Sequence, residues 1–293
     1  MRHLWTLIFC LCLTSQVACQ PLKTVNVNVV GDDGNPIEGA EVVVWFYGYQ
    51  PEDSKSDEGF TNEEGNFHAQ GRPLLGMLAR VNKDGYYQTE KDRLPMTEEQ
   101  DQRLTLRKKI KPIPLYAKRW RIVTENTNKN LGFDFEKGDW VAPYGKGVKS
   151  DVIFNVEFSK KDIWTYEYKL KVSFPNEFDG IQTFETAKYS ELKSPHLAPL
   201  GQYKKVWVHK SSRNGKNRQK QTDSMPNRNY WLRVRSKVDD DGKLIAANYV
   251  KVYGNFPDFH YYFNPTPNDL NLEFDPSQNL IKGLKYGERV NLP

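Results

Sequence analysis

Apolar and polar residues alternate over several short stretches of this chain, and turn-forming residues separate the stretches. Residues 25–29 read VNVNV, a strict alternation that predicts a half-buried strand. Residues 40–47 (AEVVVWFY) predict a second, more deeply buried strand, because β-branched and aromatic side chains favour pleated, packed surfaces. Between them, residues 31–36 (GDDGNP) are dense in turn formers. Short strands at turn-punctuated intervals, with no helical period, predict a β-sandwich.

The rest of the chain also shows strand patterns. Residues 164–174 alternate aromatic or aliphatic side chains with polar ones, which predicts a long strand with one aromatic face. Residues 151–159 are predicted to pair with it through the turn at 160–162. Residues 229–253 predict a hairpin, because Asp-Gly at its centre favours the tight turn that a hairpin needs. The predicted fold class is therefore all-β.

Three segments in the first third of the chain carry a resemblance. DDGNPIEGAEVVV, TNEEGNF and ARVNKDGYY together resemble the carboxypeptidase regulatory-like family over residues 22–108. The residues that match are Asp33, Pro36, Ile37, Gly39, Ala40, Val42, Thr61, Gly65, Phe67, Gly85 and Tyr86. The resemblance implies a transthyretin- or immunoglobulin-like β-sandwich that serves as a non-catalytic accessory or spacer module. It says little about function, because function belongs to sites rather than to folds.

The length of 293 residues suits two domains, each able to bury a core. Residues 1–19 are predicted to be a signal peptide and residues 20–112 the carboxypeptidase regulatory-like sandwich. Residues 113–293 are predicted to form a larger, mainly-β domain that resembles no family. The basic, proline-containing stretch 108–114 (KKIKPIP) is the predicted linker.

The N-terminal segment has the order of a secretory signal. Arg2 precedes an apolar run at residues 4–13, and small and polar residues follow. All three cysteines fall in or at the end of this segment. Cys19 stands where bacterial lipoproteins carry a lipidated cysteine, although Gln16 replaces the usual aliphatic residue; ordinary cleavage near this point is the alternative. We expect an exported protein of the periplasm or outer surface, attached to a membrane only through a lipid on Cys19.

Charge and motifs exclude several classes of function. The net charge of +5 falls to +4 once the signal is removed, which is too mild to imply a nucleic-acid partner. No GxSxG, HExxH or CxxC motif is present, and the histidines are scattered singly. The sequence therefore predicts no cofactor, no metal site and no catalytic centre of a familiar kind.

The loop at residues 132–147 (GFDFEKGDWVAPYGKG) is an unusual mixture of carboxylates, aromatics and glycines. Its carboxylates are Asp134, Glu136 and Asp139, and its candidate binding aromatics are Trp140 and Tyr144. Paired carboxylates beside aromatic rings could hydrolyse a glycosidic bond. They could equally order the loop by accepting backbone N–H bonds, and the sequence favours this structural interpretation.

A basic segment at residues 204–220 is the other candidate site. Its candidate binding residues are Lys204, Lys205, Lys210, Arg213, Lys216, Arg218 and Lys220. A run of like charges is usually a solvated face, but it could also attract an anionic polymer of the cell envelope. A cluster of aromatics at residues 256–263 could line a carbohydrate site and is more typical of a core.

Together these patterns predict an exported, non-catalytic binding or structural accessory protein of the bacterial envelope. Its predicted partner is a glycan or an anionic envelope polymer. The alternative is a carbohydrate-active hydrolase that uses the carboxylates of the 132–147 loop.

Overall fold

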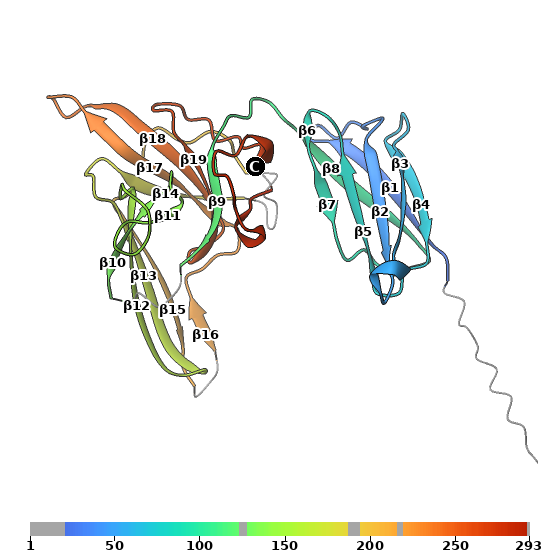
Figure 1. Cartoon of the computed structure of the whole chain (residues 1–293), viewed down its shortest axis with the longest axis horizontal. Helices are drawn as coiled ribbons and strands as arrows, with labels where there is room; N and C mark the ends of the chain where they lie inside the picture. Colours follow the sequence, from blue (N-terminus) through green and yellow to red (C-terminus); the bar gives the residue numbers. More distant parts are fainter. Residues whose placement is uncertain (1–20, 123–127, 187–193, 216–218, 292–293) are drawn as a thin grey trace, which may run out of the picture. The chain divides into compact units, whose positions relative to one another are not determined.

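A computed structural model gives the structure of the chain (Figure 1). It describes residues 21–122, 128–186, 194–215 and 219–291. The signal segment with Cys19, and also Lys216 and Arg218 of the basic segment, lie outside the described residues. Apart from three single-turn 3₁₀ segments, the regular structure described is all strand, which confirms the predicted fold class. The chain divides into two compact units, Met1–Lys108 and Lys109–Pro293.

Unit 1 is a β-sandwich of two four-stranded sheets. One sheet has the order β4-β1-β8-β6 and the other the order β3-β2-β5-β7. Strands β1 and β8 run parallel, whereas the other strand pairs of this unit are antiparallel. The elements are β1 (Lys23–Gly31), β2 (Glu41–Tyr47), η1 (Pro51–Asp53), β3 (Lys55–Phe60), β4 (Asn66–Gly71), β5 (Gly76–Asn82), β6 (Tyr86–Tyr87), β7 (Thr89–Lys91) and β8 (Glu99–Lys108).

The apolar positions of β1 and β2 fill the space between these two sheets, as their alternation predicts. The local geometry explains two residues of the nearby turns, Thr61 and Gly65. The hydroxyl of Thr61 donates to the carbonyl of Ile37 at 2.6 Å and accepts from the N–H of Ala40 at 2.9 Å, so it ties down the start of β2. Gly65 has φ +73°, and a Cβ there would lie 2.4 Å from the carbonyl oxygen of Val29. Thr61 and Gly65, two of the residues that carry the resemblance, therefore have a structural role in unit 1.

Unit 2 contains a six-stranded sheet, β11-β10-β12-β13-β15-β16, and a five-stranded sheet, β14-β17-β18-β19-β9. The predicted hairpins are present as β12–β13 and β17–β18. The elements are β9 (Tyr116–Arg121), β10 (Asn130–Asp134), β11 (Asp139–Trp140), β12 (Val152–Asp162), β13 (Thr165–Ser173), β14 (Gly180–Glu185), β15 (Val206–Arg213), β16 (Lys220–Thr222), β17 (Arg228–Val238), β18 (Leu244–Tyr253), β19 (Asp258–Asn264), η4 (Pro276–Gln278) and η5 (Tyr286–Glu288).

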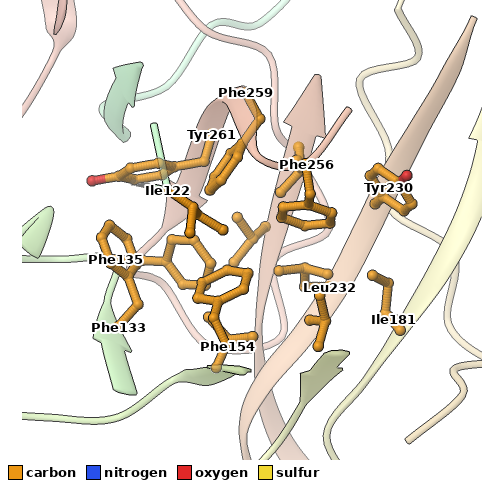
Figure 2. Packing of buried hydrophobic residues seen from close by; sticks show 14 of the residues in the cluster. Ile122, Phe133, Phe135, Phe154, Ile181, Tyr230, Leu232, Phe256, Phe259 and Tyr261 are labelled. Carbon is orange, nitrogen blue, oxygen red and sulfur yellow. The ribbon is translucent and has the colours of Figure 1, made fainter. Parts of the chain in front are cut away.

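The five-stranded sheet of unit 2 is buried on both faces. Figure 2 shows the core that it shares with the six-stranded sheet, in which Phe133, Phe154 and Phe256 pack together. The other face of the five-stranded sheet carries a second cluster of buried hydrophobic residues, to which the C-terminal segment contributes Leu272 and Phe274. Strands covered on both faces read as nearly continuous apolar runs. This explains the aromatic stretch at 256–263: its five Phe and Tyr side chains are all at most 1 % exposed, so they form core and no surface platform.

Apart from Lys108, which ends β8, the segment predicted as a linker belongs to unit 2. The buried carboxylate of Glu273 accepts the backbone N–H groups of Ile110 and Lys111 at 2.8 and 2.7 Å. The ammonium of Lys109 pairs with Asp275 at 2.8 Å. The division between the units therefore falls after Lys108, four residues before the end predicted for the first domain.

Candidate functional site

The carboxylates of the 132–147 loop are engaged by the protein itself. Asp134 is 2 % exposed, and its two oxygens accept four backbone N–H bonds at 2.9–3.1 Å. The donors are Glu136, Lys137, Val148 and Lys149. Burial acts to raise the pKa of Asp134, but the four donors outweigh burial and the pKa is lowered. This carboxylate is thus held ionised as the centre of a folded loop.

Arg235 of β17 joins three carboxylates into one cluster. Its guanidinium donates to both oxygens of Asp151 at 2.7 and 3.0 Å and to Glu136 at 2.8 Å. It also lies 3.6 Å from Asp134 and covers the ring of Phe263 at 4.7 Å. Burial acts to lower the pKa of Arg235, and the carboxylates overcome this and raise it above its usual range. We call Arg235 with Asp134, Glu136 and Asp151 the Arg235 cluster.

The backbone of β17 explains why Arg235 reaches this position. The register with β18 shifts between Val234 and Lys237, and Arg235 has φ +57°. The carboxylate of Asp179 accepts the N–H groups of Arg235 and Ser236 at 3.1 and 2.9 Å, which stabilises this irregularity. A β-bulge bends the strand locally and can re-aim a side chain. Sequence analysis missed Arg235 because no pattern in NYWLRVRSK marks the bulge.

The other predicted residues of the loop have contacts of their own. Asp139 accepts the N–H groups of Trp140 and Lys146 at 2.8 and 2.9 Å. Trp140 is only 6 % exposed and packs edge-on against Phe133 and Phe154, so the prediction of a surface binding role for this residue is corrected. Tyr144 is 41 % exposed. The aromatic character of the loop therefore serves mainly the core.

The basic segment is spread over several environments rather than gathered in one. Lys204 and Lys205 precede β15, and Lys205 pairs with Glu177 at 3.1 Å. Lys210 is exposed on β15, and the guanidinium of Arg213 stacks over the ring of Trp164 at 4.4 Å. Lys220 begins β16 and is exposed. Of these five described residues, only Lys210 borders a hollow of about 870 Å³ in unit 2.

That hollow has a volume of about 870 Å³ and lies on strands β12, β13, β15 and β16, with Asn128 at its edge. The register places Phe158 opposite Tyr168, Tyr168 opposite Ser211, and Ser211 opposite Thr222. These four side chains therefore form one row on the same face of the sheet. We refer to this feature as the β12–β16 hollow. Its size lies within the range of roughly 300–1,000 Å³ typical of ligand pockets.

The chemistry of the hollow is polar and nearly neutral. Two lysines and three carboxylates line it, and Lys169 pairs with Glu157 at 2.8 Å. Hydroxyl and amide side chains of serine, threonine, glutamine and asparagine make up most of the rest. Burial raises the pKa of Tyr168 to about 12, so its hydroxyl is protonated at neutral pH. That buried hydroxyl has no hydrogen-bond partner in the part of the chain that the structure describes.

One histidine lies next to the hollow. His209 is buried, stacks against Trp207 with ring centroids 5.9 Å apart, and pairs through Nδ1 with Asp223. Asp223 also accepts the backbone N–H of Lys210 at 3.0 Å. Among the described residues, no group of three or more His, Cys, Asp or Glu side chains is arranged to hold a metal ion. Within the same residues no helix is long and apolar enough to cross a membrane.

No family model matches this chain, and no curated protein matches it. Among solved structures, it is similar to 3-chlorocatechol 1,2-dioxygenase from Rhodococcus opacus 1CP, with 12 % identity and TM-score 0.26 over 30 % of this chain and 61 % of that one. It is also similar to the shaft pilin SpaA from Lactobacillus rhamnosus GG, with 8 % identity and TM-score 0.21 over 87 % and 94 % of the two chains. A candidate carbohydrate-binding protein from Bacteroides uniformis gives 10 % identity and TM-score 0.21 over 85 % and 100 %. Likenesses at these TM-scores carry no argument about function.

Proposed function

We propose that this protein is an exported, non-catalytic binding protein whose β12–β16 hollow takes a glycan. The observation that carries the proposal is the row of side chains along the hollow, in which the rings of Phe158 and Tyr168 lie beside the hydroxyls of Ser211 and Thr222. Glycans present apolar C–H faces together with many hydroxyl groups, so a site for them needs both aromatic surface and hydrogen-bonding groups. The hydroxyls of Ser211 and Thr222, in the same row as the two rings, are such groups.

The balance of charge favours a glycan over an anionic envelope polymer. Attraction of a polyanion requires a concentrated positive field. The hollow instead holds two lysines against three carboxylates, so it lacks such a field. Recognition here would rest on hydrogen bonds and ring contacts, which salt screens little.

The state of the loop carboxylates supports a non-catalytic function over a glycosidase. A glycosidase needs one carboxylic acid with a raised pKa to protonate the leaving group. Asp134 has a lowered pKa, and Asp134, Glu136 and Asp139 are all committed to backbone N–H groups or to Arg235. These residues order the loop.

Unit 1 fits the role of an accessory or spacer module, as its resemblance to carboxypeptidase regulatory-like domains implies. Its two sheets close on a single apolar core. The signal segment directs the protein to the envelope, with a lipid on Cys19 as its proposed anchor.

A glycan array followed by titration calorimetry tests the proposal. The variant Ser211→Ala/Thr222→Ala removes two hydroxyl groups from the row that carries Phe158 and Tyr168, and Lys205→Ala, which removes a lysine outside the hollow, is the matched control. We expect the double variant to lose at least about tenfold in affinity, because two polar contacts of about 1 kcal/mol each are removed. The control and added salt should leave the affinity unchanged.

Three results would overturn the proposal. The first is that the protein retains no glycan on the array. The second is that the double variant binds as tightly as the wild type. The third is that the bound glycan is cleaved, which would establish an enzyme.

A further inference from the structure

The turn between β12 and β13 lies beside the end of β15 at one end of the six-stranded sheet (Figure 1). The turn between β12 and β13 exposes two consecutive large apolar side chains, Ile163 at 66 % and Trp164 at 37 %. Arg213, at the end of β15, stacks on Trp164, and a Cβ on Gly215 would lie 2.8 Å from the hydroxyl of Thr165. The β12–β13 turn and the end of β15 therefore form one surface.

Cations surround these apolar side chains. Lys160, Lys161 and Lys220 are exposed, and none of them forms an ion pair in the portion of the chain that the structure describes. The nearest carboxylate in sequence, Asp162, accepts the backbone N–H of Trp164 at 2.7 Å and so shapes the turn. We define the β12–β13 tip as residues 160–164 together with Arg213 and Lys220. It carries four basic residues against one acidic residue.

Another hairpin end of unit 2 shows that this composition is not a general property of the fold. The β17–β18 turn has three consecutive aspartates, 239–241, with Lys243 and the exposed side chain of Ile245 beside them. An exposed isoleucine is thus present at both ends, but a tryptophan and an excess of cations occur only at the β12–β13 tip. Scattered exposed apolar residues need no explanation, whereas an adjacent Ile-Trp pair inside a cationic rim does.

We propose that the β12–β13 tip docks onto an anionic membrane surface. Tryptophan prefers the headgroup region of a bilayer, and an exposed isoleucine gains by entering the acyl boundary. Lysine and arginine beside such side chains are attracted to anionic headgroups. An acidic polysaccharide would satisfy the cations but would offer no apolar phase to Ile163 and Trp164. This contact is separate from the β12–β16 hollow and does not depend on the proposed glycan function.

Vesicle co-sedimentation tests the proposal, with Cys19→Ala in every protein to exclude any N-terminal lipid. The vesicles are phosphatidylcholine alone or with about 30 mol % phosphatidylglycerol, which supplies the negative surface potential. We expect binding to the anionic vesicles only. Because each lysine near an anionic surface contributes about fivefold in affinity, Lys160→Gln/Lys161→Gln should weaken binding about 25-fold. Ile163→Ser should also weaken binding, and Ile163→Ser/Trp164→Ser should weaken it more, at every salt concentration.

The control is Lys243→Gln/Ile245→Ser, which makes the same kind of change at the acidic β17–β18 turn. It should bind like the parent protein. The proposal is overturned if the parent ignores anionic vesicles, if the tip variants bind as well as the parent, or if the control loses as much as they do. Retention on an acidic polysaccharide without retention on vesicles would also overturn it.

Discussion

Two polar regions of unit 2, the Arg235 cluster and the β12–β16 hollow, differ in how their hydrogen-bonding groups are satisfied. In the cluster, each carboxylate oxygen of Asp134 and Asp151 has at least one protein donor, and the Arg235 side chain is 16 % exposed. In the hollow, polar side chains line an open space of about 870 Å³. Saturated polar groups stabilise a fold, whereas polar groups that border open space remain available to a ligand.

The two regions also differ in what they connect. Arg235 comes from β17 of the five-stranded sheet, and its carboxylate partners come from the loop and strand ends beside the six-stranded sheet. The cluster therefore ties the two layers together. The hollow is built from neighbouring strands of the six-stranded sheet together with the flanking residues Asn128 and Asp223. Loss of the cluster should affect stability, and loss of the lining of the hollow should affect binding.

The largest effect is expected for Arg235→Met. Removing this partner leaves Asp151 buried with one backbone donor, and breaking a buried ion pair in this way costs about 3–5 kcal/mol. Urea unfolding followed by tryptophan fluorescence measures the free energy of unfolding, since five of the seven tryptophans lie in unit 2.

The matched control is Arg233→Met, two residues earlier on β17. Among the residues that the structure describes, Arg233 donates to the carbonyls of Phe178 and Leu200 and forms no ion pair, so its loss should cost only about 1–2 kcal/mol. Equal losses for the two variants would contradict the structural role assigned to the cluster.

An intermediate, pH-dependent effect is expected for Asp134→Asn. An amide offers one acceptor oxygen in place of two charged ones, so the four N–H groups lose about 2–3 kcal/mol of stabilisation at neutral pH. The pKa of Asp134 is lowered on folding, so its contribution is present above the unfolded value of about 3.9 and is lost as the pH falls through the folded value.

The stability difference between wild type and Asp134→Asn should therefore shrink below about pH 4. Urea titrations at a series of pH values measure it, with Asp241→Asn at the exposed β17–β18 turn as a control. A difference that stays constant down to the acid transition would show that the carboxylate charge does not stabilise the loop.

The smallest effect on stability is expected in the hollow. Ser211→Ala/Thr222→Ala removes two hydroxyl groups and no core side chain, so the free energy of unfolding should change by no more than about 1 kcal/mol. The same urea titration measures it. A loss as large as that of Asp134→Asn would mean that these residues hold the sheet together, and the contrast between the two regions would disappear.

Several elements of the fold could be predicted from local sequence. Strict alternation identified β1 and β13, and Asp-Gly between two apolar stretches identified the β17–β18 hairpin. These signals work because side chains of a strand alternate between its faces and because a tight turn needs residues that tolerate positive φ. The structural interpretation of the 132–147 loop was favoured on the same kind of local evidence.

The sites could not be predicted in the same way. From the loop sequence alone, Trp140 and Asp134 could contact a ligand or belong to the core. In the structure, Trp140 packs against Phe133 and Phe154, and Arg235 of β17 approaches Asp134, so both residues lie in the interior. The hollow combines residues of β12, β13, β15 and β16, whose spacing along the chain gives no sign that they share a surface.

The sequence by itself determined the all-β class, the strong hairpins and the turn chemistry of unit 1, because these depend on interactions between near neighbours. The tertiary structure alone decided which aromatic residues are core, which carboxylates are saturated and where open polar surface remains. Those properties depend on burial and on partners that lie far apart in the chain, such as Arg235 and Asp151, and a bulge or a second covering layer changes them without leaving a local pattern.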